Sequence, residues 1–178
     1  MKYDISLITN YILDYDPGIS KVFLSGSIFL MCGIAVGLKT FMAERLLLVR
    51  CSSIVLTGFY VLLMFYLVVL CRSSSPERII KWKPFWSYFS LFNYAIAEHI
   101  MNVLMFIPFG FLAGSALAKG GLWKVCLAGS VVSLAIEVTQ FITKRGICNI
   151  DDVIHNTLGC VIGFAGFVLC YKMARRIA

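Results

Sequence analysis

The chain has 178 residues, of which 60% are hydrophobic and 14% are charged, and its formal net charge is +7. Because this polar content is too small to cover a soluble globule of this size, the composition excludes a soluble protein and predicts a membrane protein. The positive charge needs no nucleic-acid partner, since Lys and Arg side chains at a membrane surface interact with anionic lipids. Membrane lipids are therefore the first expected partner.

Five apolar stretches are long enough to cross a hydrocarbon core as helices, which takes about 20 residues. They cover residues 19–38, 51–71, 100–118, 125–143 and 153–171. A transmembrane barrel would instead need short segments of alternating polarity. The sequence therefore predicts an all-α integral membrane protein, a bundle of five transmembrane helices that forms a single domain over residues 1–178.

The residues before the first span carry acidic rather than basic side chains, namely Asp4, Asp14 and Asp16. A cleavable signal peptide starts with a basic cluster, so none is expected here. Ile5, Ile8 and Ile12 recur at helical spacing, which fits a short helix on the membrane surface. A frayed polar terminus explains the same residues equally well.

A segment rich in aromatic and basic residues separates the second span from the third. It contains Lys81 and Lys83 together with four aromatic side chains: Trp82, Phe85, Trp86 and Tyr88. This composition suits the lipid headgroup region. We expect it either to lie over the polar end of the bundle as an interfacial aromatic segment or to form an ordinary aromatic belt.

Polar residues gather at one end of the last three spans. In the third span they are Glu98, His99 and Asn102, and in the fifth they are Asp151, Asp152, His155 and Asn156. In the fourth span, four polar residues recur at spacings of three and four, which places them on one helix face: Ser130, Ser133, Glu137 and Gln140. Because successive spans run antiparallel, these positions meet at one membrane surface, and one polar pocket is predicted there.

Pro108 lies in the middle of the third span, where it removes one backbone hydrogen bond, so a kink is expected. Glycine pairs four residues apart occur in three spans and allow helix backbones to approach closely. We expect these glycines to pack inside the bundle: Gly33 with Gly37, Gly110 with Gly114, and Gly159 with Gly163.

Several of the polar residues also have purely structural explanations. Asn149 or Asp151 is a candidate N-cap for the fifth helix, and Arg145 is a candidate ion-pair partner for the nearby carboxylates. Interhelical hydrogen bonding or interface packing explains four further side chains: His99, Asn102, Gln140 and Asn156. Glu137 is explained least well in this way, because an ionisable group at membrane depth is costly to desolvate.

The seven cysteines are too scattered to form a metal-binding signature, and no CxxC motif occurs. Four of them lie inside predicted spans as small apolar residues: Cys32, Cys126, Cys160 and Cys170. We therefore expect no metal ligand and no cofactor.

The orientation is predicted from the acidic residues, because alternating loops give eight Lys and Arg residues on each side. Seven acidic residues fall on the side of the predicted pocket and only Glu44 on the other. Placing the acid-rich side outside gives an external N-terminus. Three basic residues near the C-terminus are then cytoplasmic: Lys172, Arg175 and Arg176.

Two sequence blocks resemble the signature blocks of the VanZ-like family of bacterial membrane proteins. They are NVLMFIPFGFLAG at residues 102–114 and EVTQFITKRGICNIDDVIHNTLGCVIGF at residues 137–164, and the Lys-Pro-Phe around Pro84 is similar to a segment that precedes them in the family. The VanZ-like core is then about residues 81–171. Carried over by motif, the positions to watch are Asn102, Pro108, Gly110, Glu137, Gln140, Asp151, Asp152, Asn156 and Gly159.

The resemblance implies a multi-pass protein of the bacterial plasma membrane, and the founding member of the family is linked to resistance against the glycopeptide teicoplanin. It implies no established chemical mechanism. One departure concerns the loop before the fifth span. Lys144 and Arg145 make it more basic than in the founding member of the family. A different ligand is therefore allowed for this chain.

Two functions fit these residues. In the first, the polar pocket faces outward and binds a glycopeptide, a lipopeptide or a lipid-linked cell-envelope molecule, while the bundle side accepts an acyl chain. In the second, an intramembrane enzyme acts on such a lipid, with Glu137 as acid or base and Asp152 or His155 as its partner. Neither HExxH nor a serine nucleophile elbow occurs, which favours binding. A proton-coupled transporter comes third, because no inverted repeat is found.

Overall fold

The computed structural model describes residues 26, 33, 46–72, 74, 76–85, 88, 93–117 and 121–177. The first expected span, residues 19–38, and the expected surface helix before it lie outside the described residues, apart from two helical glycines, Gly26 and Gly33. The count of five spans therefore stays a prediction.

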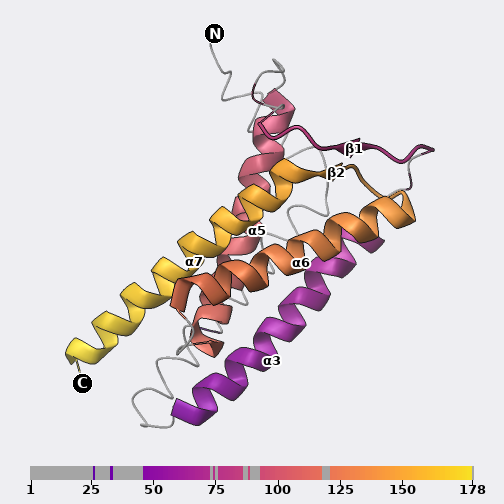
Figure 1. Ribbon diagram of the computed structural model, residues 1–178. Coiled ribbons are helices and arrows are strands. Elements are labelled where there is room, and N and C mark those ends of the chain that lie inside the picture. Colours follow the sequence, from indigo (N-terminus) through magenta and orange to yellow (C-terminus); the bar gives the residue numbers. More distant parts are fainter. Residues whose placement is uncertain are drawn as a thin grey trace.

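Long helices make up most of the described chain (Figure 1). They are α3 (Leu46–Phe65), which continues directly into the π-helix η1 (Tyr66–Leu70), then α5 (Asn93–Ala116), α6 (Gly121–Thr143) and α7 (Ile150–Ile177). With α3 and η1 taken together, four described helices are long and apolar enough to cross a membrane. The prediction of an all-α membrane protein is confirmed at that level.

Each of these helices overlaps an expected span and begins before it. The largest differences are at the start of α5, seven residues before position 100, and at the end of α7, six residues after position 171. An apolar run marks only the turns that suit hydrocarbon, whereas helical hydrogen bonding continues into the polar residues on either side. The second turn of α5, with Glu98 and His99, and the first turn of α7, with Asp151 and Asp152, therefore carry polar side chains on a helical backbone.

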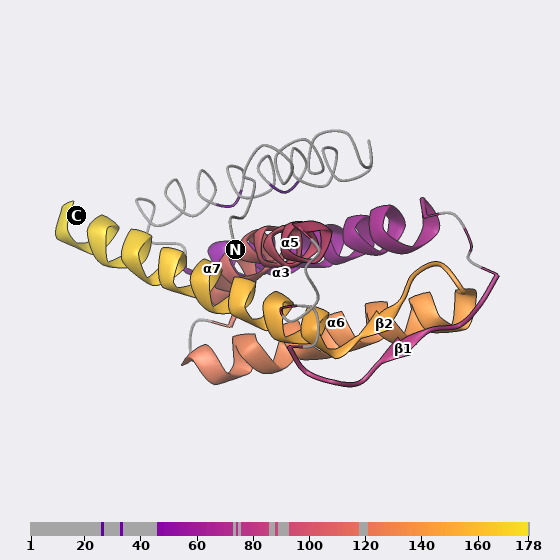
Figure 2. The same cartoon turned by 90° about the horizontal axis from the view of Figure 1, so that it is seen from above.

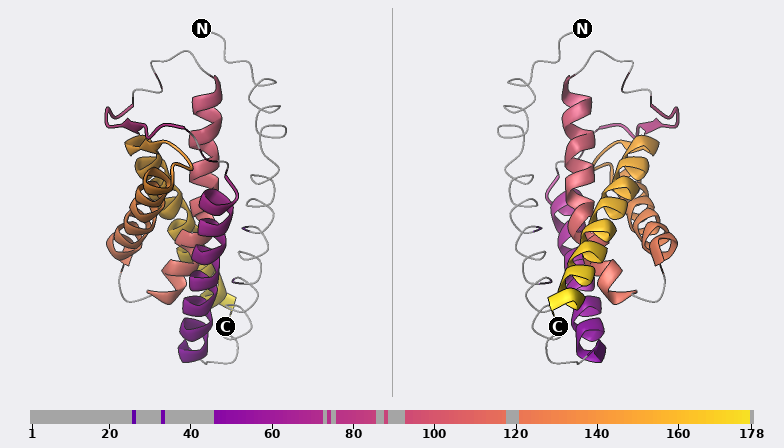
Figure 3. Two further views of the ribbon diagram at one scale, coloured as in Figure 1. Left: turned by 90° about the vertical axis from the view of Figure 1, so that its right-hand side faces the viewer. Right: turned by 90° about the vertical axis from the view of Figure 1, so that its left-hand side faces the viewer.

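Two short strands join the loops at one end of the bundle. β1 (Ile80–Lys81) pairs in parallel with β2 (Cys148–Asn149), with Ile80 opposite Cys148 and Lys81 opposite Asn149. Seen from above, β1 runs beside β2 (Figure 2). The strands lie at the end where α5 begins, and the C-terminus lies at the opposite end (Figure 3). This pairing places the loop before α5 next to the start of α7.

The core is centred on α5, which contacts α3, α6 and α7. Phe106, Phe109 and Leu112 of α5 are buried against residues from the other three helices: Tyr60, Met64, Val125, Ile136 and Cys160. The outward faces are apolar and exposed, as in Leu62, Leu134 and Leu169. Such an outer surface suits lipid rather than water.

Glycines bring α5 and α7 close together. A Cβ added at Gly110 would overlap the backbone of Cys160, and one added at Gly159 or Gly163 would overlap a carbonyl oxygen of α5. Because lipid tails are as apolar as the helix surface, association in a membrane depends on such close packing. This crossing fixes the first turn of α7 against the first turns of α5.

Pro108 lies inside α5, and the helical assignment continues through it. Proline has no N–H, so the carbonyl of Leu104 loses its usual donor, and the ring crowds this part of the helix. The Tyr60 hydroxyl donates a hydrogen bond to the carbonyl of Met105, the next residue, at 2.7 Å. A side chain from a neighbouring helix thus hydrogen-bonds the backbone one residue from the carbonyl that the proline leaves without its usual donor. The kink itself stays a prediction.

Replacing Gly163 by Ala should destabilise the bundle by about 1–3 kcal/mol, because the new methyl group overlaps α5 backbone that cannot move locally. Thermal unfolding in detergent measures this change. Gly166→Ala on the same helix is the matched control, because its Cβ would meet only the Phe111 ring at 3.7 Å. Equal melting temperatures for the two variants would contradict the close crossing.

Candidate functional site

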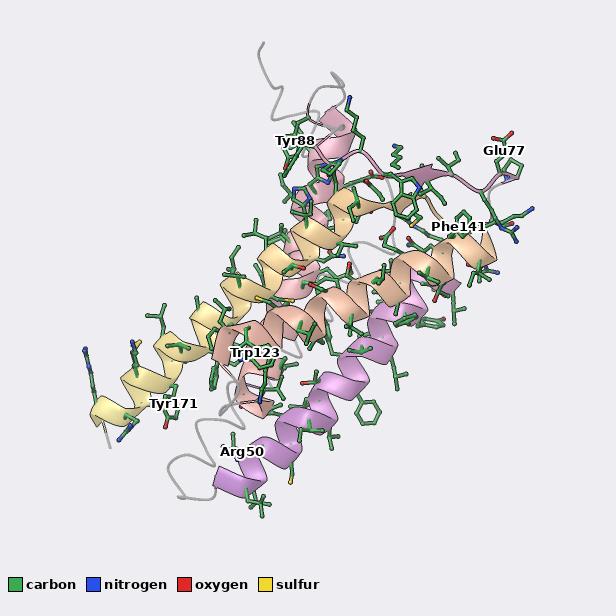
Figure 4. The ribbon with its side chains drawn as sticks, in the orientation of Figure 1. Arg50, Glu77, Tyr88, Trp123, Phe141 and Tyr171 are labelled. Carbon is green, nitrogen blue, oxygen red and sulfur yellow. The ribbon has the colours of Figure 1, made fainter. Side chains whose placement is uncertain are left out.

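Polar residues at one end of α5, α6 and α7 form one group joined by hydrogen bonds, ring contacts and electrostatic interactions, which we call the polar cluster. Tyr88 lies at this end, whereas Trp123 and Tyr171 lie toward the other (Figure 4). All members except Glu98 and Asp152 are buried. The members are Glu98, His99, Ser133, Glu137, Asn149, Asp151, Asp152, His155 and Asn156.

Glu137 is buried near the end of α6, with 3% of its surface exposed. Its Oε2 accepts a hydrogen bond from the backbone N–H of Asn149 at 2.8 Å. Its charge interacts with those of Asp152, Arg72 and Glu98. Because a carboxylate has two accepting oxygens, this one hydrogen bond occupies only part of its capacity.

Asn149 is the N-cap of α7. Its Oδ1 accepts a hydrogen bond from the N–H of Asp151 at 3.2 Å, and its Nδ2 donates to Oδ1 of Asp152 at 3.2 Å. An N-cap Asn satisfies a backbone donor that the first helical turn leaves unpaired. Since its own N–H bonds Glu137, Asn149 connects a carboxylate of α6 to a carboxylate of α7.

Three rings stack between the loop, α5 and α7. The His99 and His155 rings are nearly parallel, at 5°, with centroids 4.1 Å apart, and the Tyr88 ring lies 5.3 Å from His99. His155 Nδ1 is 2.6 Å from the carbonyl oxygen of Asp151, which only accepts, so Nδ1 carries the hydrogen. Nε2 then accepts from the Tyr88 hydroxyl at 2.6 Å. Both nitrogens of His155 thus form hydrogen bonds with groups other than Glu137.

The loop before α5 is tied to the start of α7. Besides the β1–β2 pairing, the N–H of Phe85 donates to Oδ1 of Asp151 at 2.6 Å. Phe85 has a positive φ of 58°, which is uncommon for a residue other than glycine. Burial and the neighbouring Asp151 carboxylate raise the pKa of Tyr88, so its hydroxyl stays protonated and donates at neutral pH. The aromatic loop therefore lies against the polar cluster, and its place in the headgroup region stays a prediction.

Neutral polar side chains lie one helical turn deeper than the carboxylates. Asn156 Nδ2 donates to Ser133 Oγ at 2.8 Å, and the hydroxyls of Ser130 and Thr157 are 2.9 Å apart. Oδ1 of Asn156 is buried and has no hydrogen-bond partner among the described residues. The polar face of α6 that the sequence indicates therefore lies against α7.

Two site residues predicted from the sequence donate hydrogen bonds to backbone carbonyls of η1 and are not members of the polar cluster. Gln140 Nε2 donates to the carbonyl of Val68 at 3.2 Å, and Arg145 donates to the carbonyl of Leu70. The sequence-based suggestion that Arg145 pairs with the carboxylates is therefore wrong for this structure. The reason is local, because the last carbonyls of a helix attract cations and lack intrahelical donors. Asn102 is half-buried one turn from Glu98 on α5.

Arg72 and Lys81 are the cations whose charges act on Glu137 or Asp152, and the sequence analysis did not select either as a site residue. Arg72 interacts with both carboxylates, and Lys81 interacts with Asp152 and His99. Both residues were recognisable from position, because Arg72 follows the second span directly and Lys81 lies in the loop at the same membrane surface. Their charge, rather than that of Arg145, partly compensates the carboxylates.

The carboxylates also affect the nearest thiol. Burial, and then the charges of Glu137 and Asp152, raise the pKa of Cys148, so this thiol stays protonated and weakly nucleophilic. Within the described ranges, no three His, Cys, Asp or Glu side chains are grouped so as to hold a metal ion. The described cluster thus offers hydrogen bonding, charge and proton exchange.

A family model described as VanZ/LLP1 matches residues 57–171, more than half of the chain and all of the polar cluster. Protein VanZ of Enterococcus faecium is 39% identical over 75 residues, which are 42% of this chain and 47% of that protein. The match thus spans about half the length of this curated relative. No solved structure matches the chain.

Replacing Asn149 by Ala should lower the free energy of unfolding by about 1 kcal/mol, because α7 loses its N-cap and Asp152 loses a donor. Thermal unfolding in detergent measures the loss. Asn149→Ser keeps an oxygen that caps the helix, so it should retain most of the stability. If the Ala variant and the wild type have the same melting temperature, the cap does not stabilise the start of α7.

Proposed function

The chain belongs to the VanZ/LLP1 family, and from this premise we propose that its polar cluster binds a glycopeptide, a lipopeptide or a lipid-linked cell-envelope molecule. Through this binding the chain contributes to resistance of the teicoplanin type. The observation that carries the proposal is the electrostatic interaction among Glu98, Glu137 and Asp152, which lie on three different helices. Ionisable groups in membrane spans are costly and mark functional sites by default.

The arrangement supports binding more than catalysis. Glu137 and Asp152 are both contacted by Asn149, which holds the carboxylates in place. His155, one of the expected acid–base partners of Glu137, is occupied by Tyr88 and the Asp151 carbonyl. Fixed acceptors on rigid helices favour recognition of a polar headgroup.

One observation favours an enzyme as the second candidate. The charges of Glu137 and Asp152 interact, and paired carboxylates are a common acid–base arrangement. Incubating the purified chain with labelled envelope lipids distinguishes the two functions. Turnover that Glu137→Gln abolishes would favour the enzyme, and binding without turnover would favour the binding protein.

The proposal needs the polar end of the bundle to face outward. It then faces molecules outside the plasma membrane, and the basic end of α7 faces the cytoplasm. Lys172, Arg175 and Arg176 are exposed there and suit an anionic inner leaflet. The acid-rich loops lie on the outer side in this orientation.

Cysteine labelling in intact cells should show this orientation. A cysteine introduced at Ile147, which is 38% exposed in the loop before β2, should react with a membrane-impermeant maleimide. A cysteine introduced at Leu122, 42% exposed at the start of α6, should react only after the cells are opened. The parent chain with its seven native cysteines gives the background. The reverse pattern would remove the case for an external ligand.

Replacing Glu137 by Gln should keep the fold and reduce protection against teicoplanin. The amide oxygen still accepts from the Asn149 N–H, so the melting temperature should change little, whereas the ability to ionise and to exchange a proton is lost. Glu137→Leu should instead leave that N–H unpaired at a cost of about 1–3 kcal/mol. Melting in detergent and drug susceptibility of a host carrying each variant are measured together. A stable Gln variant that protects fully would contradict a role for ionisation of Glu137.

A further inference from the structure

The polar cluster and Asn102, which lies one turn below Glu98, form two layers that three helices build in the same way. Each helix contributes a carboxylate near the membrane surface and a neutral polar residue four positions away, one turn deeper. Residues four apart share a helix face. The pairs are Glu98 with Asn102, Glu137 with Ser133, and Asp152 with Asn156.

The upper layer contains more carboxyl groups than cations among the described residues. Glu137 interacts electrostatically with Asp152 and Glu98, and Asp152 also interacts with Asp151. Two cations, Arg72 and Lys81, act on Glu137 or Asp152, against the three carboxyl groups that the helices contribute to this layer. Charges at membrane depth are costly unless they are compensated, so the layer suits one further positive group.

Three oxygen atoms of the cluster remain available as hydrogen-bond acceptors. Asn149 occupies one oxygen of Glu137 and one of Asp152, and the second oxygen of each makes no hydrogen bond among the described residues. Below them, the buried Oδ1 of Asn156 also lacks a described partner. A ligand that fits here must donate hydrogen bonds as well as carry positive charge.

We propose that the polar cluster recognises a primary ammonium group of its ligand. This inference rests on the proposed function and names the chemical group that the site selects. An ammonium group offers one positive charge and three N–H donors. A hydroxyl group offers a donor without the charge, and a trimethylammonium group offers the charge without a donor. This ammonium group is either part of a lipid headgroup or the protonated amino group of a glycopeptide.

Native mass spectrometry of the full chain in detergent tests this selectivity. The probes are three phospholipids with identical acyl chains, bearing ethanolamine, choline or glycerol. The ethanolamine lipid should bind about tenfold more tightly than the choline lipid, because charge-assisted hydrogen bonds form only with the former. Competition with teicoplanin, before and after acetylation of its amines, identifies the source of the ammonium group.

Asp152→Asn should abolish the preference for ethanolamine, since it replaces an ionisable carboxyl group by a neutral amide of the same shape. Glu77→Gln is the matched control, because Glu77 is an exposed carboxylate at the far end of the loop from Tyr88 (Figure 4). If Asp152→Asn fails to fold, Glu98→Gln at an exposed position should reduce the preference instead.

The outcomes separate the inference from the proposed function. Equal binding of the three lipids and of acetylated and unmodified teicoplanin would overturn ammonium recognition while leaving ligand binding intact. A preference for ethanolamine that persists in Asp152→Asn and Glu98→Gln would also overturn it. Failure of every lipid and of teicoplanin to bind would overturn the proposed function as well.

Discussion

The structure depends on how carboxylates are held at membrane depth. Asp152 and Glu137 lie on helices that are otherwise suited to lipid, and removing such groups from water is costly without hydrogen bonds and counter-charges. Asn149 supplies hydrogen bonds to both carboxylates, and Arg72 and Lys81 supply positive charge. Lys81 lies on β1 and Asn149 on β2, so the paired strands hold two of the groups that compensate the carboxylates.

The glycine-mediated crossing of α5 and α7 makes the cluster geometrically precise. Because Gly110 and Gly163 allow the two backbones to touch, the first turns of both helices are fixed relative to each other. The parallel stack of His99 on His155 shows how close these turns are. Packing in the apolar half of the bundle therefore determines the spacing of polar groups at its end, and a site on rigid helices can select a ligand by small differences in geometry.

Much of this organisation could be predicted from the sequence, and the limits have physical causes. Helical spacing predicted that Ser133 and Glu137 share one face of α6. Because successive spans run antiparallel, it also followed that this part of α6 lies near the start of α7. Arg145 was assigned the wrong partner because charge alone suggested a carboxylate, whereas the carbonyl of Leu70 is its hydrogen-bond acceptor. The stack formed by Tyr88 depends on a loop turn at Phe85, where φ is positive, and no residue pattern specifies that turn.

The central claim is that the polar cluster is a binding site and not only a structural element of the bundle. The most direct measurement is an experimental density map of the full chain in nanodiscs prepared from the lipids of its own bacterial membrane. The account predicts density for a bound headgroup or glycopeptide about 3 Å from the free oxygens of Glu137 and Asp152. A map in which Glu98, Glu137 and Asp152 contact only protein groups, with teicoplanin present as well as absent, would contradict it.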